Sequence, residues 1–341
     1  MKETVVGKAM GTFLSVTSYE GKAQEADALV RSIFHQIEMT ASRFLPSSEV
    51  SRITQAAGDH PVSISPLCRS LLFDSLRQAV FTGGIFDPTV GALTRLWNVG
   101  QPEEIIPVRE KQEKARSLVS YLDLIVKGET AFLKRAGMAL DLGGMAKEYA
   151  LHLAAKRASF SSMGAMMIDA GGDMALIGKK PDGTSWRMGI QHPRRKDTLA
   201  ASVVMTEWDT IETSGDYRRF LARDGIFQSH IFQLKEESTS LISATLIYQR
   251  GEVMLPITGA ACIAGGLARV VSWLEHLPGV EGIFITEGRE VYVTEGISSV
   301  TKVLTKDLTR KALILHRAGT VLFSALLPMM DEETAWSPVF K

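Results

Sequence analysis

The order of the two hydrophobic periodicities along this 341-residue chain is the feature that most limits its fold. Helical spacing of apolar residues predicts helices mainly in the first half, within 24–40, 65–84 and 145–157. After residue 200, alternating apolar residues predict strands within 202–214, 226–234 and 241–249, then a buried helix over 259–274 and a hairpin over 282–296. This order predicts an α/β (α+β) fold of mixed sheets with packed helices rather than strict βαβ alternation. With no linker or repeat in view, we expect a single domain over residues 1–341.

Charge and hydropathy exclude two classes of partner. Lys plus Arg and Asp plus Glu are 38 each, so no net field would gather nucleic acid. The longest uncharged stretch, Val253–Ala268, has about 16 residues and is broken by Pro256, whereas a spanning helix needs about 20. The N-terminus lacks a signal-peptide pattern. We therefore expect no membrane span and a cytoplasmic location for the chain as written, the alternative being export or lipid anchoring through a leader that this chain does not contain.

The two cysteines, Cys68 and Cys262, both lie in apolar contexts. Their positions predict buried thiols rather than a disulfide or a metal site.

Four junctions place polar residues beside glycine, where the backbone can approach a ligand closely. They are AMGTF (9–13), TGGIFDPTVGALTRLW (82–97), LDLGGMAKEYALHLAAK (140–156), and DAGGDMALIG (169–178) taken with IETSGDYRRF (211–220). In the third, Asp141 is expected to end a strand and a helix to follow the glycines, so that Lys147 in its first turn could reach an anion at the helix N-terminus. The spacing matches neither a dinucleotide fingerprint nor a P-loop, and taken alone the junction favours packing glycines over a ligand site.

In the fourth junction, Gly171 and Gly172 are expected to interrupt a strand as a bulge or a ligand approach would. The run from Thr213 to Asp216 is expected to form a polar turn. A solvated loop and a binding site are both open interpretations of that turn.

The stretch QSHIFQLKEES (228–238) contains a histidine, His230, beside apolar residues. Histidine exchanges protons near neutral pH, so it suits general-base chemistry. A half-buried structural imidazole on a strand is the alternative.

Taken together and in order, these stretches resemble the FAD:protein FMN transferase family, also called ApbE-type flavin transferases. The matching segments are MGT, SRFLPSSEVSRI, GGIFDPTVGALTRLW, DLGGMAKEYALHLAA, AGGDMALIGKKPDGTSW, ETSGDY and SHI, from about residue 7 to 232. The resemblance implies two connected lobes around an FAD cleft. It also implies transfer of FMN from FAD to a Ser or Thr hydroxyl of a partner flavoprotein, in this family often a subunit of a membrane redox complex, with release of AMP.

The resemblance also assigns residue roles. It implies FAD contacts at Met10, Phe44, Ile85, Phe86, Asp87, Asp141, Lys147 and Ile231. Phe44 takes the position of an aromatic that stacks on FAD, and His230 that of the general base which accepts the acceptor hydroxyl's proton. The carbonyl of Gly144 matches a metal ligand.

The sequence departs from the family pattern in two places. The family continues after the histidine with an Asp-Pro pair, where this chain has FQLKEES. The C-terminal metal motif corresponds here to VMLPITGAACIAGG, in which Leu255 or Pro256 replaces the first carboxylate and Thr258 is the one oxygen-bearing side chain. Because Mg²⁺ prefers oxygen ligands that include carboxylate, we expect a weak or absent site unless an acid such as Glu252 substitutes.

These departures separate the functional hypotheses. FMN transfer is the leading one, and an FAD-binding protein without transferase activity is the alternative. An FAD pyrophosphatase would need the same metal chemistry with water as acceptor. A scaffold that no longer binds flavin would not explain why the FAD-facing positions remain suitable.

Overall fold

The computed structural model describes residues 1–217, 219–235, 240–251 and 253–317. The chain divides into two compact units, and each is described by itself. The sheet unit comprises Met1–Gln36, Lys147–Tyr217 and Glu237–Arg317. The helical unit comprises Ile37–Ala146 and Arg218–Glu236, while its third segment, Ala318–Lys341, lies outside the described residues.

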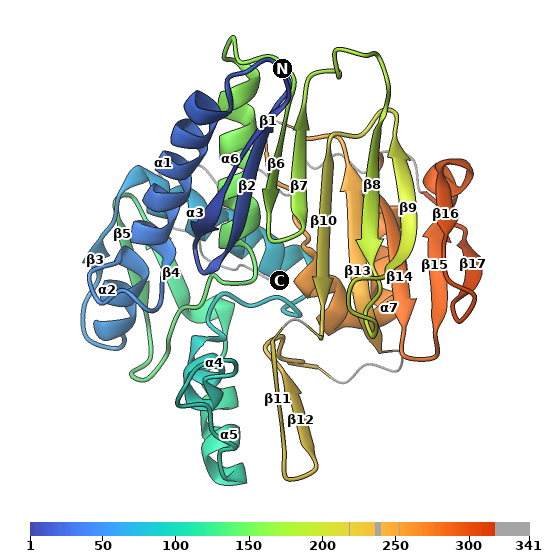
Figure 1. The fold of residues 1–341 in the computed structure, drawn as a ribbon. Coiled ribbons are helices and arrows are strands. Elements are labelled where there is room, and N and C mark those ends of the chain that lie inside the picture. Colours follow the sequence, from blue (N-terminus) through green and yellow to red (C-terminus); the bar gives the residue numbers. More distant parts are fainter. Residues whose placement is uncertain (218, 236–239, 252, 318–341) are drawn as a thin grey trace. The chain divides into compact units, whose positions relative to one another are not determined.

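A nine-stranded sheet forms the centre of the sheet unit (Figure 1). In spatial order its strands are β1 (Glu3–Ala9), β2 (Thr12–Ser18), β6 (Met166–Ala170), β7 (Asp173–Ile177), β10 (Thr210–Gly215), β13 (Leu241–Tyr248), β14 (Glu281–Thr286), β15 (Glu290–Thr294) and β17 (Thr309–Leu313). Neighbouring strands are antiparallel except for the parallel pair β15–β17. Every residue of β13 is buried, which explains its near-continuous apolar sequence LISATLIY.

A second sheet and a helix cover part of the large sheet. The second sheet has the order β16 (Thr301–Val303), β9 (Leu199–Met205), β8 (Trp186–Gln191), and a 3₁₀ turn, η2 (Glu295–Val300), precedes β16. The inward residues of β8 alternate along the strand and join one core with apolar residues of β7, β10, β13, β14 and β15. Helix α7 (Gly259–Glu275) packs against β10 and β13. Helices α1 (Ala23–Ala41) and α6 (Ala146–Ser159) each include a boundary between the two units.

The helical unit contains short helices and two small sheets. Its helices are α2 (Glu49–Gln55), α3 (Pro66–Phe81), α4 (Gly91–Trp97), α5 (Arg109–Ser117) and the 3₁₀ turn η1 (Tyr121–Asp123). One sheet has the order β3 (Val62–Ser63), β5 (Thr130–Leu133), β4 (Leu124–Lys127), and the other is the hairpin of β11 (Phe220–Arg223) and β12 (Ile226–Ser229). Ser65 caps α3 as predicted, because its hydroxyl oxygen accepts the backbone N–H of Cys68 at 3.1 Å.

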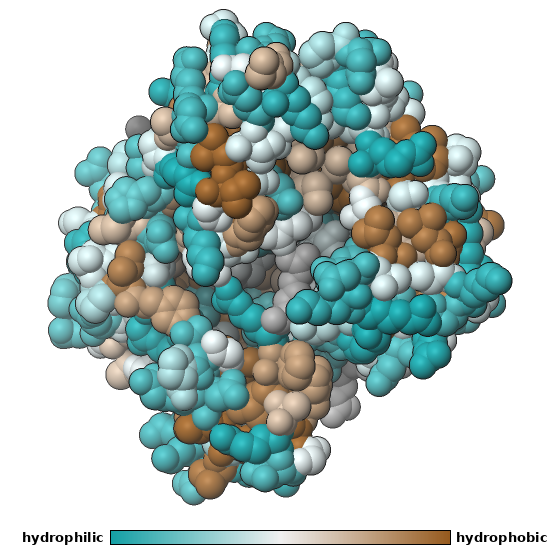
Figure 2. Space-filling model, viewed as in Figure 1, coloured by the Kyte–Doolittle hydropathy of each residue, from teal (hydrophilic) through white to brown (hydrophobic). Residues whose placement is uncertain are grey.

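The β11–β12 hairpin exposes apolar side chains. The Phe220 and Phe227 rings stack with centroids 5.3 Å apart, and both residues are about half exposed. Figure 2 shows apolar surface on the visible face over this part of the helical unit.

Most elements match the sequence-based predictions, and the mixed α/β class is confirmed. The helices expected at 24–40, 65–84, 145–157 and 259–274 are α1, α3, α6 and α7. Both cysteines are buried free thiols, as predicted. None of the helices within the described ranges is both long and apolar enough to cross a bilayer.

Five local predictions were wrong. Residues 202–214 contribute to two strands, β9 and β10, rather than one, and residues 213–215 belong to buried β10 rather than to a turn. Gly171 and Gly172 form the turn between β6 and β7 instead of a bulge. His230 follows β12 and is not within it. Asp141 follows an isolated bridge at Ala139 rather than a strand, because only that residue pairs with Val90.

Candidate functional site

Two tight turns lie near one another at an edge of the sheet unit. Met10 and Gly11 connect β1 and β2 with φ of 48° and 68°, the backbone of a primed two-residue hairpin turn. Gly171 and Gly172 connect β6 and β7 with φ of 68° and 94°. A Cβ on Gly171 would collide with the Thr12 hydroxyl, so the close approach of the turns requires glycine there.

Lys147 lies beside the second turn. It is in the first turn of α6, and its ammonium group forms ion pairs with the carboxylates of Asp173 and, at 3.2 Å, Glu148. Asp173 is almost fully buried, and its Oδ1 accepts the Thr213 backbone N–H at 2.7 Å. Two of the expected FAD contacts thus belong to the sheet unit: Met10 lies in the β1–β2 turn, and Lys147 of α6 pairs with Asp173 beside the β6–β7 turn.

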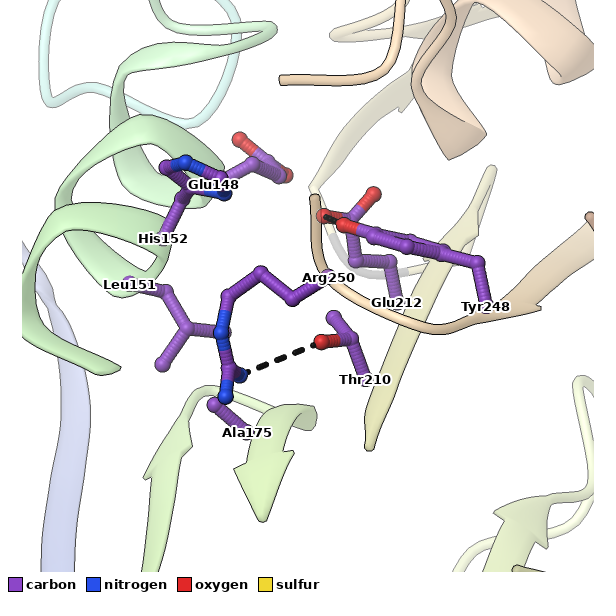
Figure 3. A pocket seen from close by; sticks show the side chains of 8 residues that line it. All are labelled: Glu148, Leu151, His152, Ala175, Thr210, Glu212, Tyr248 and Arg250. Carbon is purple, nitrogen blue, oxygen red and sulfur yellow. Dashed lines mark hydrogen bonds between the residues drawn. The ribbon is translucent and has the colours of Figure 1, made fainter. Parts of the chain in front are cut away.

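A buried acidic pair extends this cluster (Figure 3). The side chains of Glu148 on α6 and Glu212 on β10 point toward the same small pocket. The Tyr248 hydroxyl donates to Glu212 Oε1 at 2.5 Å. Burial, and then the charge of Glu148, raise the pKa of Glu212 to about 7. Glu148 Oε2 is buried without a hydrogen-bond partner among the described residues.

Sequence reasoning missed this pair of carboxyl groups. The sequence offered one weak signal, a charged residue inside a predicted strand, as in TIETS of β10. Charged residues are seldom fully buried unless they are paired. Such a residue indicates a buried polar interaction, but the sequence does not show which residue is its partner.

In the helical unit, Asp141 joins three of the matched stretches. Its Oδ2 accepts the Thr94 hydroxyl at 2.6 Å and lies 3.0 Å from Arg43 Nε, while its Oδ1 accepts the Gly143 backbone N–H at 2.8 Å. Its own backbone N–H donates to Pro88 O at 2.9 Å. The segments that the sequence separates therefore meet at one carboxylate.

Phe44 is held beside that carboxylate by its neighbour. The guanidinium carbon of Arg43 lies 4.0 Å from the centroid of the Phe44 ring, a cation–π contact. Phe44 is nevertheless 56 % exposed, so much of its ring surface is accessible to a flat ligand. Neither Arg43 nor Thr94 was predicted as a site residue.

The expected FAD-lining segment at residues 85–87 is largely inside the helical unit. Ile85, Phe86 and Asp87 are all buried. Asp87 Oδ1 accepts both the backbone N–H and the hydroxyl of Thr89, at 2.8 and 2.6 Å, and Oδ2 accepts the Tyr121 N–H at 2.8 Å. Burial raises the pKa of Asp87, and these hydrogen bonds offset part of that rise. Both carboxylate oxygens thus serve the local fold.

His230 is fixed from the base of the β11–β12 hairpin. Its backbone N–H donates to Arg219 O at 3.0 Å, and its ring Nδ1 lies 2.9 Å from the same oxygen. Because a carbonyl oxygen only accepts, Nδ1 carries the proton in this contact, which puts the lone pair of a neutral imidazole on Nε2.

The segment after His230 is held at several points. The half-buried Ile231 precedes Phe232, whose ring packs edge-on against Trp97 with centroids 6.3 Å apart. Lys235 Nζ donates to Gly83 O at 2.6 Å, and Arg116 donates to Gln233 O at 3.0 Å. Residues 232, 233 and 235 of the stretch that departs from the family pattern are therefore held by ring packing and hydrogen bonds within the helical unit.

The metal ligands implied by the resemblance do not make a fitting donor set. Gly144 belongs to the helical unit and Thr258 to the sheet unit, where Thr258 is buried and its hydroxyl caps α7 by accepting the Ala261 N–H at 3.4 Å. Within the ranges that the structure describes, no three His, Cys, Asp or Glu side chains cluster in a way that could hold a metal. Glu252, the suggested substitute, lies outside the described residues. Backbone and hydroxyl oxygens alone do not fit Mg²⁺, which usually takes carboxylate ligands.

Comparisons with known proteins identify relatives along most of the chain. The ApbE family model matches residues 10–284. An FAD:protein FMN transferase of Treponema pallidum is 26% identical over 316 residues, covering 86% of this chain and 87% of that protein. One from Klebsiella pneumoniae is 28% identical over 253 residues, covering 71% and 72%.

Solved structures show the same fold. The ApbE protein of Thermotoga maritima superposes with a TM-score of 0.76 at 25% identity, covering 87% of this chain and 98% of that one. The apo flavinyl transferase ApbE of Pseudomonas stutzeri gives 0.71 at 24% identity, covering 84% and 92%. The match of the family model over most of the sequence, together with these relatives, shows that the chain belongs to the ApbE family.

Proposed function

We propose that this protein is an FAD:protein FMN transferase that moves FMN from FAD to a Ser or Thr hydroxyl of a partner flavoprotein. The observation that carries the proposal is the set of family motifs in the family's order. In the helical unit these motifs supply Asp141 with its partner Arg43, the exposed Phe44 and His230, whose ring is oriented by a hydrogen bond. In the sheet unit they supply Met10 and Lys147. Family relatives across most of the chain bear the same name.

The reaction exchanges the phosphoanhydride bond of FAD for a phosphate ester bond to the acceptor. The acceptor oxygen forms a bond to the FMN phosphorus, the bond from that phosphorus to the bridging oxygen breaks, and AMP leaves with that oxygen. Nε2 of His230 takes the hydroxyl proton, because Nδ1 is committed to the Arg219 carbonyl. The exposed Phe44 ring offers a stacking surface for a flat ring of FAD.

One observation favours a second candidate, an FAD-binding protein without transfer. The segment at the start of α7 offers Thr258 and no carboxylate to a divalent cation. If charge neutralisation depended on that cation alone, FAD would bind and remain intact.

The test incubates the full chain with FAD and a redox-subunit domain that carries an acceptor threonine, with and without Mg²⁺. We expect the acceptor to gain the mass of FMN and an equal amount of AMP to appear. AMP without flavinylation would identify a pyrophosphatase, and FAD retained through gel filtration without AMP would identify the binding protein.

Two variants examine His230. His230→Asn keeps a side-chain N–H for the Arg219 carbonyl but has no basic nitrogen, so we expect transfer to fall at least about 100-fold with FAD affinity nearly unchanged. The exposed His60 in the same unit supplies the control, His60→Asn, which should transfer FMN normally. Full activity of His230→Asn would assign His230 a structural role.

A further inference from the structure

Lys147 lies at one end of a buried group of acidic side chains in the sheet unit. Its ammonium group pairs with the carboxylate of Asp173 and, at 3.2 Å, with Glu148 Oε1. The second oxygen of Glu148, Oε2, is buried without a hydrogen-bond partner among the described residues, and the residue is only 6 % exposed. Because an unpaired carboxylate oxygen at this depth destabilises the fold, the group lacks one hydrogen-bond donor.

Glu212 is the side chain placed to supply that donor. It is 3 % exposed and faces the same small pocket as Glu148 (Figure 3). The Tyr248 hydroxyl donates to Glu212 Oε1 at 2.5 Å, so a proton on this carboxyl group would sit on Oε2. A protonated Glu212 therefore offers an O–H group to the pocket that Glu148 also lines.

The other donors at this pocket are engaged elsewhere. Arg250 pairs with Asp209 at 3.3 Å, and Thr210 donates to the same carboxylate at 2.8 Å. The Tyr248 hydroxyl is committed as described, and His152 has an interaction of its own. A proton held between the two glutamate carboxyl groups completes the hydrogen bonding while these contacts stay as they are.

The electrostatics of the pair favour such a proton. Burial, and then the charge of Glu148, raise the pKa of Glu212 to about 7. The Tyr248 hydrogen bond and the charge of Lys147 lower this pKa in part. Two carboxyl groups that interact closely exchange protons as a pair, because like charges oppose the ionisation of both. The other charged and titratable side chains around the pair are Lys147 and His152 of α6, Asp173 of β7, Asp209 before β10, Tyr248 of β13, Arg250 after β13 and Cys262 of α7.

We propose that Glu148 and Glu212 share one proton and that they act through it as positioning residues for Lys147, which the family resemblance assigns to FAD. The inference rests on the proposed function and concerns the sheet unit alone. With the proton in place, the ammonium group, two carboxylates and one neutral carboxyl group carry one net negative charge, and loss of the proton makes it two. The second negative charge holds the ammonium group more tightly among the carboxylates and repels the phosphates of FAD. FAD should therefore bind more weakly once the pair is ionised.

The first test uses the unliganded chain, with ¹³C in the glutamate carboxyl groups and ¹⁵N in the lysine side chains, and follows both by NMR against pH. We expect one glutamate resonance to titrate near pH 7 and to be absent from Glu212→Gln. The ¹⁵Nζ resonance of Lys147, assigned with Lys147→Arg, should shift with the same midpoint. Glu148→Gln should lower that midpoint, because it removes a neighbouring charge. Tyr248→Phe should raise it, because it removes a hydrogen bond to the ionised form.

The second test measures FAD affinity by calorimetry between about pH 6 and 8. The dissociation constant of the unmodified chain should rise about tenfold over this range, and that of Glu212→Gln should change less than about twofold. Riboflavin, which has no phosphate, should show no comparable dependence. The exposed Glu207 of the same unit supplies the control, since Glu207→Gln should behave as the unmodified chain. His152→Gln should keep the dependence, because the carboxyl pair and not the imidazole titrates.

A Glu212 resonance that titrates near the ordinary value of 4.5 would overturn the inference, because the pair would then hold no proton at neutral pH. The same pH dependence of FAD affinity in the unmodified chain and in Glu212→Gln would overturn it as well, since the proton would not act on the ligand. If the unmodified chain binds no FAD at any pH, the proposed function fails, and the glutamate and lysine resonances still decide whether the shared proton positions Lys147.

Discussion

At the scale of single residues, Asp87 was expected to contact FAD, yet its carboxylate accepts hydrogen bonds from neighbouring residues of the helical unit. Asp87→Asn should lower the free energy of unfolding by about 1–3 kcal/mol. The amide has one accepting oxygen in place of two, so the backbone N–H of either Thr89 or Tyr121 would face an NH₂ group and lose its hydrogen bond. Urea denaturation would measure the loss, and the exposed Asp59→Asn in the same unit should change little. Unchanged stability combined with weaker FAD binding would show instead that the carboxylate serves the ligand.

At the scale of elements, α7 is a helix in two pieces. Gly266 has φ 69° and ψ 173°, a backbone that is essentially restricted to glycine. Gly266→Ala should therefore cost about 1–3 kcal/mol in a denaturant titration. Gly288→Ala is the matched control, since φ there is not positive and the nearest atom to its Cβ would be Thr286 Oγ1 at 3.7 Å. An unchanged midpoint for Gly266→Ala would mean that the helix can straighten without loss.

The same element shows how far sequence reasoning reached. The apolar run after Thr258 was enough to predict a buried helix, because hydrophobic periodicity reports which face of an element is buried. The kink was not predictable, since a glycine inside a helical run can adopt either the helical backbone conformation or the positive φ that Gly266 has. The partners of Asp141 and Glu212 were not predictable either, because they come from distant segments that only the tertiary fold brings together. Thr213–Gly215 misled us since polar residues inside a strand carry the same local signal as a turn.

At the scale of the whole molecule, Glu212 makes stability depend on pH. Its folded pKa of about 7 lies above the ordinary 4.5, so between these values the folded state binds more protons than the unfolded state. Stability should therefore be greatest below about pH 4.5 as far as this group is concerned, and should fall by about 3 kcal/mol as pH rises to about 7.

Glu212→Gln tests this dependence, because a neutral amide removes the titration. We expect the free energy of unfolding of the variant to change less from pH 5 to 8 than that of the unmodified chain. At pH 8 the variant should be the more stable of the two. Tyr248→Phe removes the hydrogen bond that holds the Glu212 pKa down, so its loss of stability should extend to higher pH. If Glu212→Gln were less stable than the unmodified chain at pH 8, the folded protein would stabilise the ionised carboxylate, contrary to the prediction.

The two buried thiols give each unit its own chemical reporter. Cys68 lies on α3 of the helical unit and Cys262 on α7 of the sheet unit, both are fully buried, and burial raises the pKa of each. Since only an exposed thiolate reacts readily, alkylation of either cysteine requires its own unit to open. Mass spectrometry of the labelled peptides during slow unfolding can therefore time the opening of the two units in one sample, without introducing a probe into the chain.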